Sequence, residues 1–216
     1  MADTKTTALT ENTTPAASDI MMIVDDPGGS AATQKITVTN LATLINSLSG
    51  RVLISEQTPT GTGTLSWASI PATYKSLEIE YVARGTTAAT TANMACYLNN
   101  DTTATNYRRT LILGGGTTTI STSGDADAVV AIISAATAPA GSCGSGTIKI
   151  VNYASTTFNK QILARNGARV DDSSTFEYQI NTTMEWESTT AVNRVDLTLS
   201  AGNYDTGSTL RLYGVF

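Results

Sequence analysis

The sequence contains no histidine, and this limits the chemistry that the chain could perform. Histidine is the side chain that most readily gains and loses a proton near neutral pH, and it is the commonest metal ligand. A catalytic group of the Ser-His-Asp or Cys-His type is therefore excluded, and so are most zinc sites. The next candidates are the carboxylates and the cysteines.

Three close pairs of aspartates are the carboxylate candidates: Asp25 with Asp26, Asp125 with Asp127, and Asp171 with Asp172. Calcium prefers several oxygen ligands, and no EF-hand spacing surrounds the first pair. Two carboxylates can hydrolyse a glycosidic bond when the fold holds them at the right separation. Turns of an acidic protein commonly carry such residues, so we interpret the pairs as solvated turns. We expect no catalytic residue, no metal and no cofactor, with a glycan-processing enzyme as the alternative.

The two cysteines are Cys96 and Cys143. Residues 1–14 (MADTKTTALTENTT) have no apolar core, so they are not expected to act as a signal peptide. Proteins that stay in a cytoplasm rarely keep disulfides. We therefore expect two free, buried thiols, and a bridge between them is the alternative.

Aromatic and basic residues give the candidates for surface recognition. Trp186 stands between two glutamates. If those carboxylates face solvent, alternation along a strand turns Trp186 inward; a sugar-stacking platform is the functional alternative. Tyr107 precedes Arg108 and Arg109, and an arginine of this pair that points inward would require an acidic partner. The surface-recognition candidates are Tyr107, Arg109 and Trp186.

The composition excludes two classes of partner. The net charge is -5, and only 14% of the residues are charged. Because binding to phosphates needs clustered cations, nucleic acid is not an expected partner. No apolar run approaches the roughly 20 residues of a membrane-spanning helix, so membrane insertion is not expected either.

Alternating apolar residues predict the strands that would position these groups. Val195, Leu197 and Leu199 alternate with polar residues, and the segment 77–82 repeats the pattern. Such runs recur between residues 64 and 216, separated by turns rich in Gly, Asn, Asp and Thr. They predict a mainly β chain that forms an antiparallel, jelly-roll-like β-sandwich. We expect the last run, 210–215, to be tucked into a sheet because Phe216 follows it.

A smaller module is predicted before the sandwich. Residues 1–18 form a polar arm, and residues 20–24 (IMMIV) are strand-like. A Pro-Gly turn at 25–30 follows, after which Ile36 and Val38 resume a strand pattern, so a hairpin is expected. Asn40 is a good N-cap residue for a short helix, and Gly50 lies where a left-handed C-terminal cap would lie.

This short helix carries an apolar stripe. Its residues are spaced at i, i+3, i+4 and i+7, and a helix of this length is marginal by itself. The stripe must be buried either within its own chain or against copies of itself around a three-fold axis. The docking and oligomer candidates are Ile20, Ile23, Val24, Leu41, Leu44, Ile45 and Leu48. The predicted organisation is a module over 1–50, a linker over 51–63 and a sandwich over 64–216. Within the linker, residues 51–57 are strand-like and residues 58–63 (TPTGTG) are a flexible hinge.

Two sets of segments resemble proteins of tailed bacteriophages. Residues 15–19 (PAASD), 22–27 (MIVDDP) and 34–41 (QKITVTNL) look like the N-terminal module of small virion proteins. Residues 70–77 (IPATYKSL), 98–101 (LNND), 106–107 (NY), 185–187 (EWE), 207–208 (GS) and 212–214 (LYG) are similar to a jelly-roll-like domain of phage structural proteins.

The resemblance implies a non-enzymatic part of the virion, assembled in the host cytoplasm. Proteins of this type are usually homotrimers with an N-terminal anchor and a distal sandwich. Expected partners are other virion proteins of the tail, neck or capsid, together with a host surface glycan. The chain lacks a shaft repeat, so we expect a short tail fibre or spike that attaches to the host surface; a capsid decoration or cement protein is the alternative.

Overall fold

The computed structural model describes residues 14–25, 32–48, 50–115, 118–125, 127–171 and 177–216. Within these ranges, the side chains of residues 22–25, 32–33, 43, 46–47 and 118–125 are not described. The chain divides into two compact units, residues 1–50 and residues 51–216. Each unit is described by itself.

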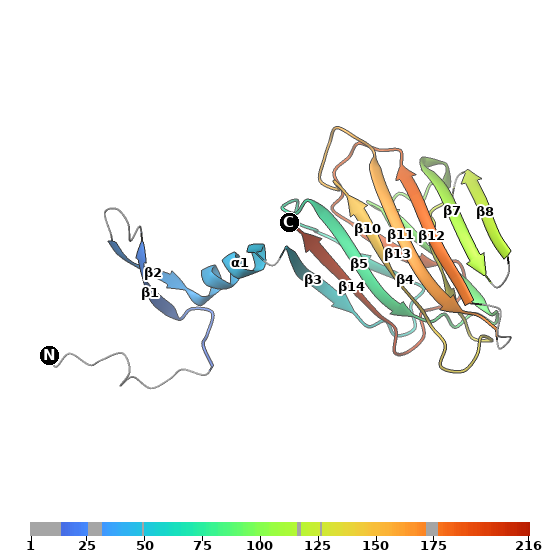
Figure 1. Ribbon diagram of the computed structural model, residues 1–216, viewed down its shortest axis with the longest axis horizontal. Coiled ribbons are helices and arrows are strands. Elements are labelled where there is room, and N and C mark those ends of the chain that lie inside the picture. Colours follow the sequence, from blue (N-terminus) through green and yellow to red (C-terminus); the bar gives the residue numbers. More distant parts are fainter. Residues whose placement is uncertain (1–13, 26–31, 49, 116–117, 126, 172–176) are drawn as a thin grey trace. The chain divides into compact units, whose positions relative to one another are not determined.

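The N-terminal unit contains a β-hairpin and a helix (Figure 1). Strand β1 (Ile20–Asp25) pairs with β2 (Ala32–Thr37) in antiparallel register, with Ile20 opposite Thr37. Helix α1 (Val38–Leu48) follows β2 directly. The hairpin and the short helix predicted from the sequence are therefore both present.

Helix α1 begins earlier than its sequence predicts. The backbone N–H of Asn40 donates to the hydroxyl of Thr37 at 3.2 Å, so Thr37 is the N-cap and Asn40 lies within the first turn. The first two N–H groups of the helix donate to carbonyls of the preceding segment, Val38 to Asp19 and Thr39 to Ala17. A helix leaves its first N–H groups without intrahelical partners, and these bonds satisfy them. Gly50 has φ of +71°, as expected for a left-handed cap.

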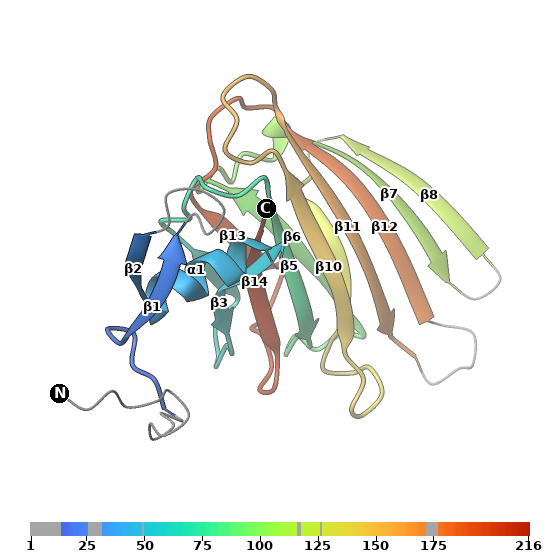
Figure 2. The same cartoon turned by 60° about the vertical axis from the view of Figure 1, so that its left-hand side comes forward.

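The second unit is an antiparallel β-sandwich, as predicted (Figure 2). Within the described residues, its larger sheet has eight strands and its smaller sheet has four. The larger sheet, in spatial order, contains β3 (Arg51–Gln57), β14 (Thr209–Val215), β5 (Ser76–Ala83), β10 (Gly144–Val151), β11 (Lys160–Arg169), β12 (Glu177–Trp186), β7 (Tyr107–Gly115) and β8 (Thr118–Asp125). The smaller sheet contains β4 (Thr64–Trp67), β13 (Val195–Leu199), β6 (Thr91–Leu98) and β9 (Val129–Ser134).

The linker predicted over residues 51–63 is wrong over its first seven residues. Residues 51–57 form β3, which pairs with β14 at the edge of the larger sheet. The register shifts between Leu212 and Tyr213, so that Ile54 is an extra residue on β3. A bulge of this kind reverses the alternation of faces within the strand. The boundary between the two units therefore lies between Gly50 and Arg51.

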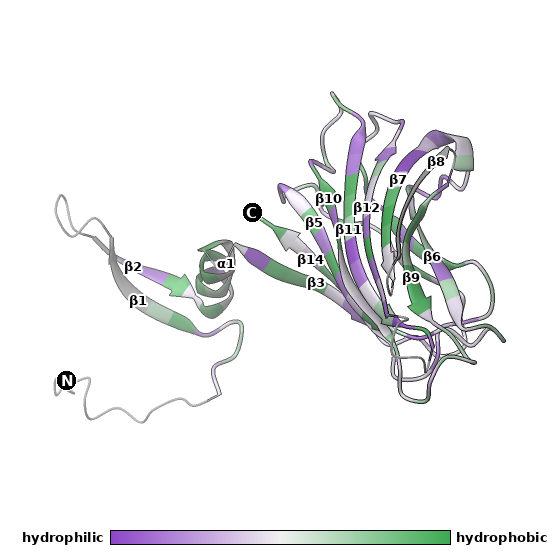
Figure 3. Ribbon diagram, turned by 45° about the vertical axis from the view of Figure 1, so that its right-hand side comes forward, coloured by the Kyte–Doolittle hydropathy of each residue, from purple (hydrophilic) through white to green (hydrophobic). Residues whose placement is uncertain are grey.

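The core lies between the two sheets. On the larger sheet, alternate residues turn inward, such as Leu77 and Ile79 on β5 and Ile148 and Ile150 on β10, and all four are fully buried. They face the smaller sheet, whose strand β9 is hydrophobic along most of its length (Figure 3). Burying each large apolar side chain contributes about 1.5–3 kcal/mol. Alternation along the strands thus supplies the main stabilisation of the sandwich.

Strand β14 is an interior strand of the larger sheet. It pairs with β3 on one side and with β5 on the other, and its Leu210 and Leu212 are fully buried. The Phe216 ring packs edge-on against Tyr74, with ring centres 5.0 Å apart. The expectation that the last strand is tucked into a sheet is confirmed.

Polar side chains of the larger sheet cover the free edge of β9. This strand pairs only with β6 among the described residues, so the carbonyl groups on its other side need partners. The amide of Asn166 donates to the Ile132 carbonyl at 2.7 Å, and the hydroxyl of Thr182 donates to the Val130 carbonyl at 3.2 Å. These inward hydrogen bonds join the two sheets at the edge of the sandwich.

Candidate binding surfaces

The apolar stripe of α1 is exposed. The side chains of Leu44, Ile45 and Leu48 are 51%, 55% and 78% exposed, and Leu41 is half-buried. Within the N-terminal unit, the hairpin therefore does not bury these three residues. Helix α1 also carries no charged residue. The stripe is therefore an apolar surface without charged groups on the same helix.

The hairpin adds apolar surface to the same unit. Ile20 is 57% exposed and Met21 is 41% exposed. Ile23 and Val24 belong to β1, but their side chains lie outside the described part of the chain. Several exposed apolar residues in one small unit mark an interaction surface more often than a single exposed apolar residue does.

Two of the predicted surface-recognition residues are buried. Tyr107 is 0% exposed and Trp186 is 4% exposed, and their rings stack with centres 6.5 Å apart. The alternation of β7 and β12 turns both side chains into the core because these residues are directly opposite each other across the two strands. Neither residue can therefore present its ring to a ligand at the surface, and their prediction as surface-recognition residues is wrong.

The polar atoms of these two rings converge on Asp101. The Trp186 indole N–H donates to Oδ2 of Asp101 at 2.8 Å, and the Tyr107 hydroxyl donates to its backbone carbonyl at 2.8 Å. Burial alone would raise the pKa of the Asp101 carboxyl, but hydrogen bonds from Asn106, Trp186 and Thr103 outweigh it and lower this pKa. The group is a structural network that fixes the turn after β6.

Arg109 points inward, and Arg108 points outward. The guanidinium of Arg109 pairs with Asp127 at 2.9 Å, and that of Arg108 pairs with Glu187 at 3.0 Å. The expectation that an inward arginine of this pair needs an acidic partner is therefore confirmed. Arg109 is neutralised and mostly buried, so it is not a surface contact either.

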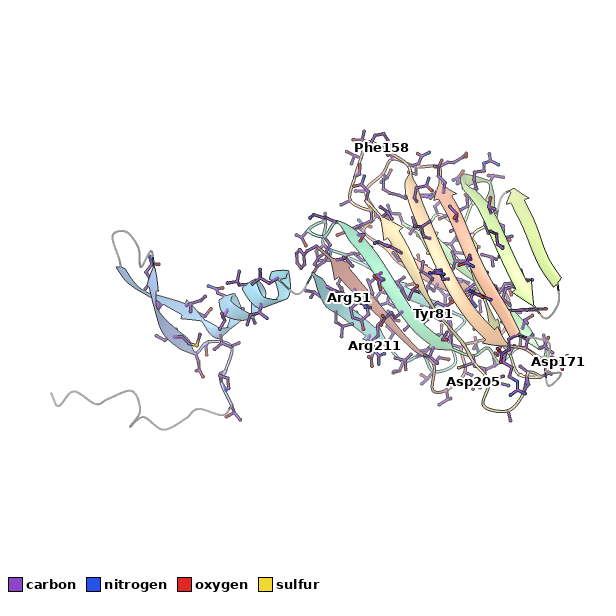
Figure 4. All side chains as sticks on the ribbon, viewed as in Figure 1. Arg51, Tyr81, Phe158, Asp171, Asp205 and Arg211 are labelled. Atoms are coloured by element: carbon purple, nitrogen blue, oxygen red, sulfur yellow. The ribbon has the colours of Figure 1, made fainter. Side chains whose placement is uncertain are left out.

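The outer face of the larger sheet carries a charge network at the β3 end (Figure 4). Arg51 contacts Glu80 at 2.8 Å and Glu78 at 3.6 Å, and its guanidinium carbon lies 3.6 Å from the centre of the Tyr213 ring. On neighbouring β14, Arg211 pairs with Glu56 at 2.5 Å. This pairing raises the pKa of Arg211. Each arginine at this end of the face is thus paired with at least one glutamate.

Farther along the same face, β10, β11 and β12 form a shallow hollow of about 360 Å³. Its lining includes Ser145, Arg165, Gly167, Gln179 and Asn181. The Arg165 Nε atom donates to Oδ1 of Asn181 at 3.0 Å. No pattern within one strand predicted this hollow, because its residues come from three strands and meet only through their register.

A second hollow, of about 410 Å³, lies where β5 meets the loops before β10 and β14. Arg84 holds these loops in place, since its guanidinium donates to the carbonyls of Pro139 at 3.0 Å and Ala138 at 2.9 Å. Its Nε atom also lies 3.9 Å from Oδ2 of Asp205, which Figure 4 labels. The guanidinium of Arg84, which lines this hollow, is thus already engaged by carbonyl and carboxylate groups of the protein.

Both cysteines are free thiols. Cys96 is buried in the core, and its burial raises its pKa to about 12, with a further contribution from the charge of Asp196. Cys143 is exposed in the second hollow. The expectation of free thiols is confirmed, and the expectation that both are buried is wrong for Cys143.

The aspartate pairs are only partly covered by the described residues. Asp26 and Asp172 lie outside them, as do the side chains of Asp25 and Asp125. Asp127 is engaged by Arg109. Among the described residues, no three acidic or cysteine side chains form a group that could hold a metal ion. In the same part of the chain, no helix is both long and apolar enough to cross a membrane.

Comparison with known proteins gives no relative. No protein-family model, curated protein or solved structure matches the chain significantly.

Proposed function

We propose that this chain is a non-enzymatic structural protein of a tailed-phage virion, a short tail fibre or spike that attaches the particle to the host surface. In this proposal, the N-terminal unit docks on other virion proteins as a homotrimer, and the sandwich displays the outer face of its larger sheet. The observation that carries the proposal is the exposed, uncharged apolar stripe of α1.

The stripe favours assembly because α1 would be only marginally stable by itself. An isolated helix shorter than about 12–15 residues is marginal in water, and α1 has 11 residues. Leu41, Leu44 and Leu48 follow the spacing of a coiled-coil seam, and Ile45 lies beside it. Identical helices can meet here without repulsion between like charges, because α1 carries none.

The sandwich favours a display role. Its core is filled by side chains from both sheets, and hydrogen bonds from Asn166 and Thr182 fix the edge of β9. Recognition usually resides in residues that a rigid scaffold positions. The virion part of the proposal rests on the segments that resemble phage structural proteins in both units.

Incorporation into phage particles tests the proposal. The double variant Leu44→Glu/Leu48→Glu puts charge on the stripe, and we expect it to fold but to be missing from purified particles. Asn40→Glu is the matched control, because it adds a carboxylate to the first turn of the same helix, where a negative charge is favourable. Absence of the unaltered protein from particles would contradict the proposal.

The number of copies per particle separates the two locations. A tail fibre or spike is present in a small number of copies relative to the major capsid protein, whereas a decoration protein approaches it in number. Quantitative mass spectrometry of purified particles measures this ratio. A ratio near that of the capsid protein would favour the decoration alternative over the fibre.

A further inference from the structure

The hollow on β10, β11 and β12 runs across the strands on the outer face of the larger sheet. In the register of the sheet, Ser145 is opposite Gly167, Gly167 is opposite Gln179, and Gln179 is opposite Gly114 on β7. Gln179 therefore stands between two glycines that belong to neighbouring strands. Arg165 and Asn181 lie opposite each other two residues farther along, and they form one side of the hollow.

Packing does not explain the two glycines beside Gln179. A Cβ atom on Gly167 would meet no atom nearer than 3.7 Å, and one on Gly114 none nearer than 3.8 Å. Neither residue has positive φ. By contrast, a Cβ on Gly146 would lie 2.3 Å from the Arg165 carbonyl. Glycine in a strand interior weakens the strand and often marks a site where a ligand approaches the backbone closely.

Arg165 differs from four other arginines of the larger sheet. Arg51, Arg108, Arg109 and Arg211 each pair with a carboxylate, whereas Arg169 donates to the backbone carbonyl of Asp171 at 3.4 Å. Within the described ranges, Arg165 has no carboxylate partner, although the chain is acidic overall. The Nε atom of Arg165 donates to Asn181, so the two terminal nitrogens of the guanidinium are available to bind a ligand. These two nitrogens can bind one carboxylate in a bidentate manner.

The polar side chains that line the hollow beside Arg165 are neutral. They include the amides of Gln179 and Asn181 and the hydroxyl of Ser145. The described residues give the Gln179 side chain no hydrogen-bond partner. A carboxylated sugar matches this set, because it presents one carboxylate and several hydroxyl groups on a compact ring. An acidic peptide fits less well, since it presents several carboxylates and Arg165 is the only charged residue among the described residues that line the hollow.

We propose that this hollow binds a carboxylated sugar residue of a surface glycan. The carboxylate binds the terminal nitrogens of Arg165, the hydroxyl groups bind Gln179, Asn181 and Ser145, and the ring lies over Gly167. The inference rests on the proposed function, because it names the ligand class of the face that the sandwich displays.

Titration of the full chain with defined sugars tests the proposal. The probes are an oligogalacturonide with its carboxyl-reduced form, and sialyllactose with lactose, measured by isothermal titration calorimetry. We expect at least one acidic probe to bind more tightly than its neutral counterpart. Arg165→Gln should weaken that binding by about tenfold or more, because it removes charge-assisted hydrogen bonds.

Two further variants separate the hollow from general charge attraction. Gly167→Val fills the hollow and should abolish binding, while the open space above Gly167 and the strand backbone accommodate the side chain. Lys149→Gln removes the same charge from the same face outside the hollow, and it should leave binding unchanged.

Each outcome bears on the proposal. Equal binding of acidic and neutral probes would overturn it, and so would equal weakening by Arg165→Gln and Lys149→Gln. Incorporation into particles is measured separately with the α1 variants. A particle protein that binds no acidic sugar would therefore overturn the inference and leave the proposed function in place.

Discussion

The indole N–H of Trp186 donates to Oδ2 of Asp101 at 2.8 Å, and this bond ties the end of β12 to the turn that follows β6. The same carboxylate accepts hydrogen bonds from Asn106 and from the backbone N–H of Thr103. One acidic side chain thus organises the end of the sandwich where the two sheets meet.

Replacing Asp101 should therefore destabilise the fold. We expect Asp101→Ala to lower the free energy of unfolding by about 1–3 kcal/mol, because the buried indole N–H loses its acceptor. Urea unfolding followed by tryptophan fluorescence measures this change. In a Trp186→Phe background, Asp101→Ala should lower the free energy of unfolding by less, since the indole N–H of Trp186 is already absent. An unchanged cost in that background would contradict the coupling of these two residues.

Acid should weaken the same network. The pKa of Asp101 lies below its ordinary value of 3.8 in the folded chain. A carboxyl with a lowered folded pKa stabilises the protein above its unfolded pKa, and this stabilisation is lost as the pH falls through the folded pKa. We expect the unaltered protein to lose stability below about pH 4, and Asp101→Asn to lose less. Thermal unfolding across pH 2–6 compares the two; parallel curves would contradict this role.

Self-association should depend on the stripe of α1. We expect the full chain to sediment as a trimer, and Leu44→Glu/Leu48→Glu to sediment as a monomer with an intact sandwich. Burying a charged side chain in an apolar seam raises the free energy of the trimer by several times the thermal energy, because the charge loses its water without gaining a partner. Sedimentation velocity measures the state, and far-UV circular dichroism checks the fold. A chain that stays monomeric at high concentration would count against the trimer.

The two thiols should react at different rates. Cys143 is exposed, whereas Cys96 is buried with its pKa raised to about 12. Because the thiolate is the reactive form, a disulfide reagent should modify Cys143 in the folded protein and reach Cys96 only after unfolding. Ellman's reagent should therefore count one thiol in buffer and two in denaturant. Fast release of two equivalents from the folded chain would contradict this burial.

Several features of the fold could be predicted from local patterns. The alternation of Val195, Leu197 and Leu199 indicated a half-buried strand, and the spacing from Leu41 to Leu48 indicated a helix with an apolar stripe. Both signals are periods within one segment, which the side-chain geometry of strands and helices imposes directly. Alternation also favoured an inward Trp186, as the structure shows.

Other features could not be read from a single segment. Residues 51–57 are strand-like in sequence, but their place in the larger sheet rather than in a linker depends on pairing with β14, a distant segment. The prediction of Tyr107 as a surface residue fails because its environment depends on Trp186 and Asp101, which belong to other segments of the chain.

Local patterns were thus sufficient for the two-part organisation, the β class of the larger part and the apolar face of the helix. They could not show which polar residues share a surface, and that information came from the folded chain alone. Arg165, Gln179 and Ser145 meet because three strands pair in one register, and register is set by contacts between distant segments rather than by the residues within each strand.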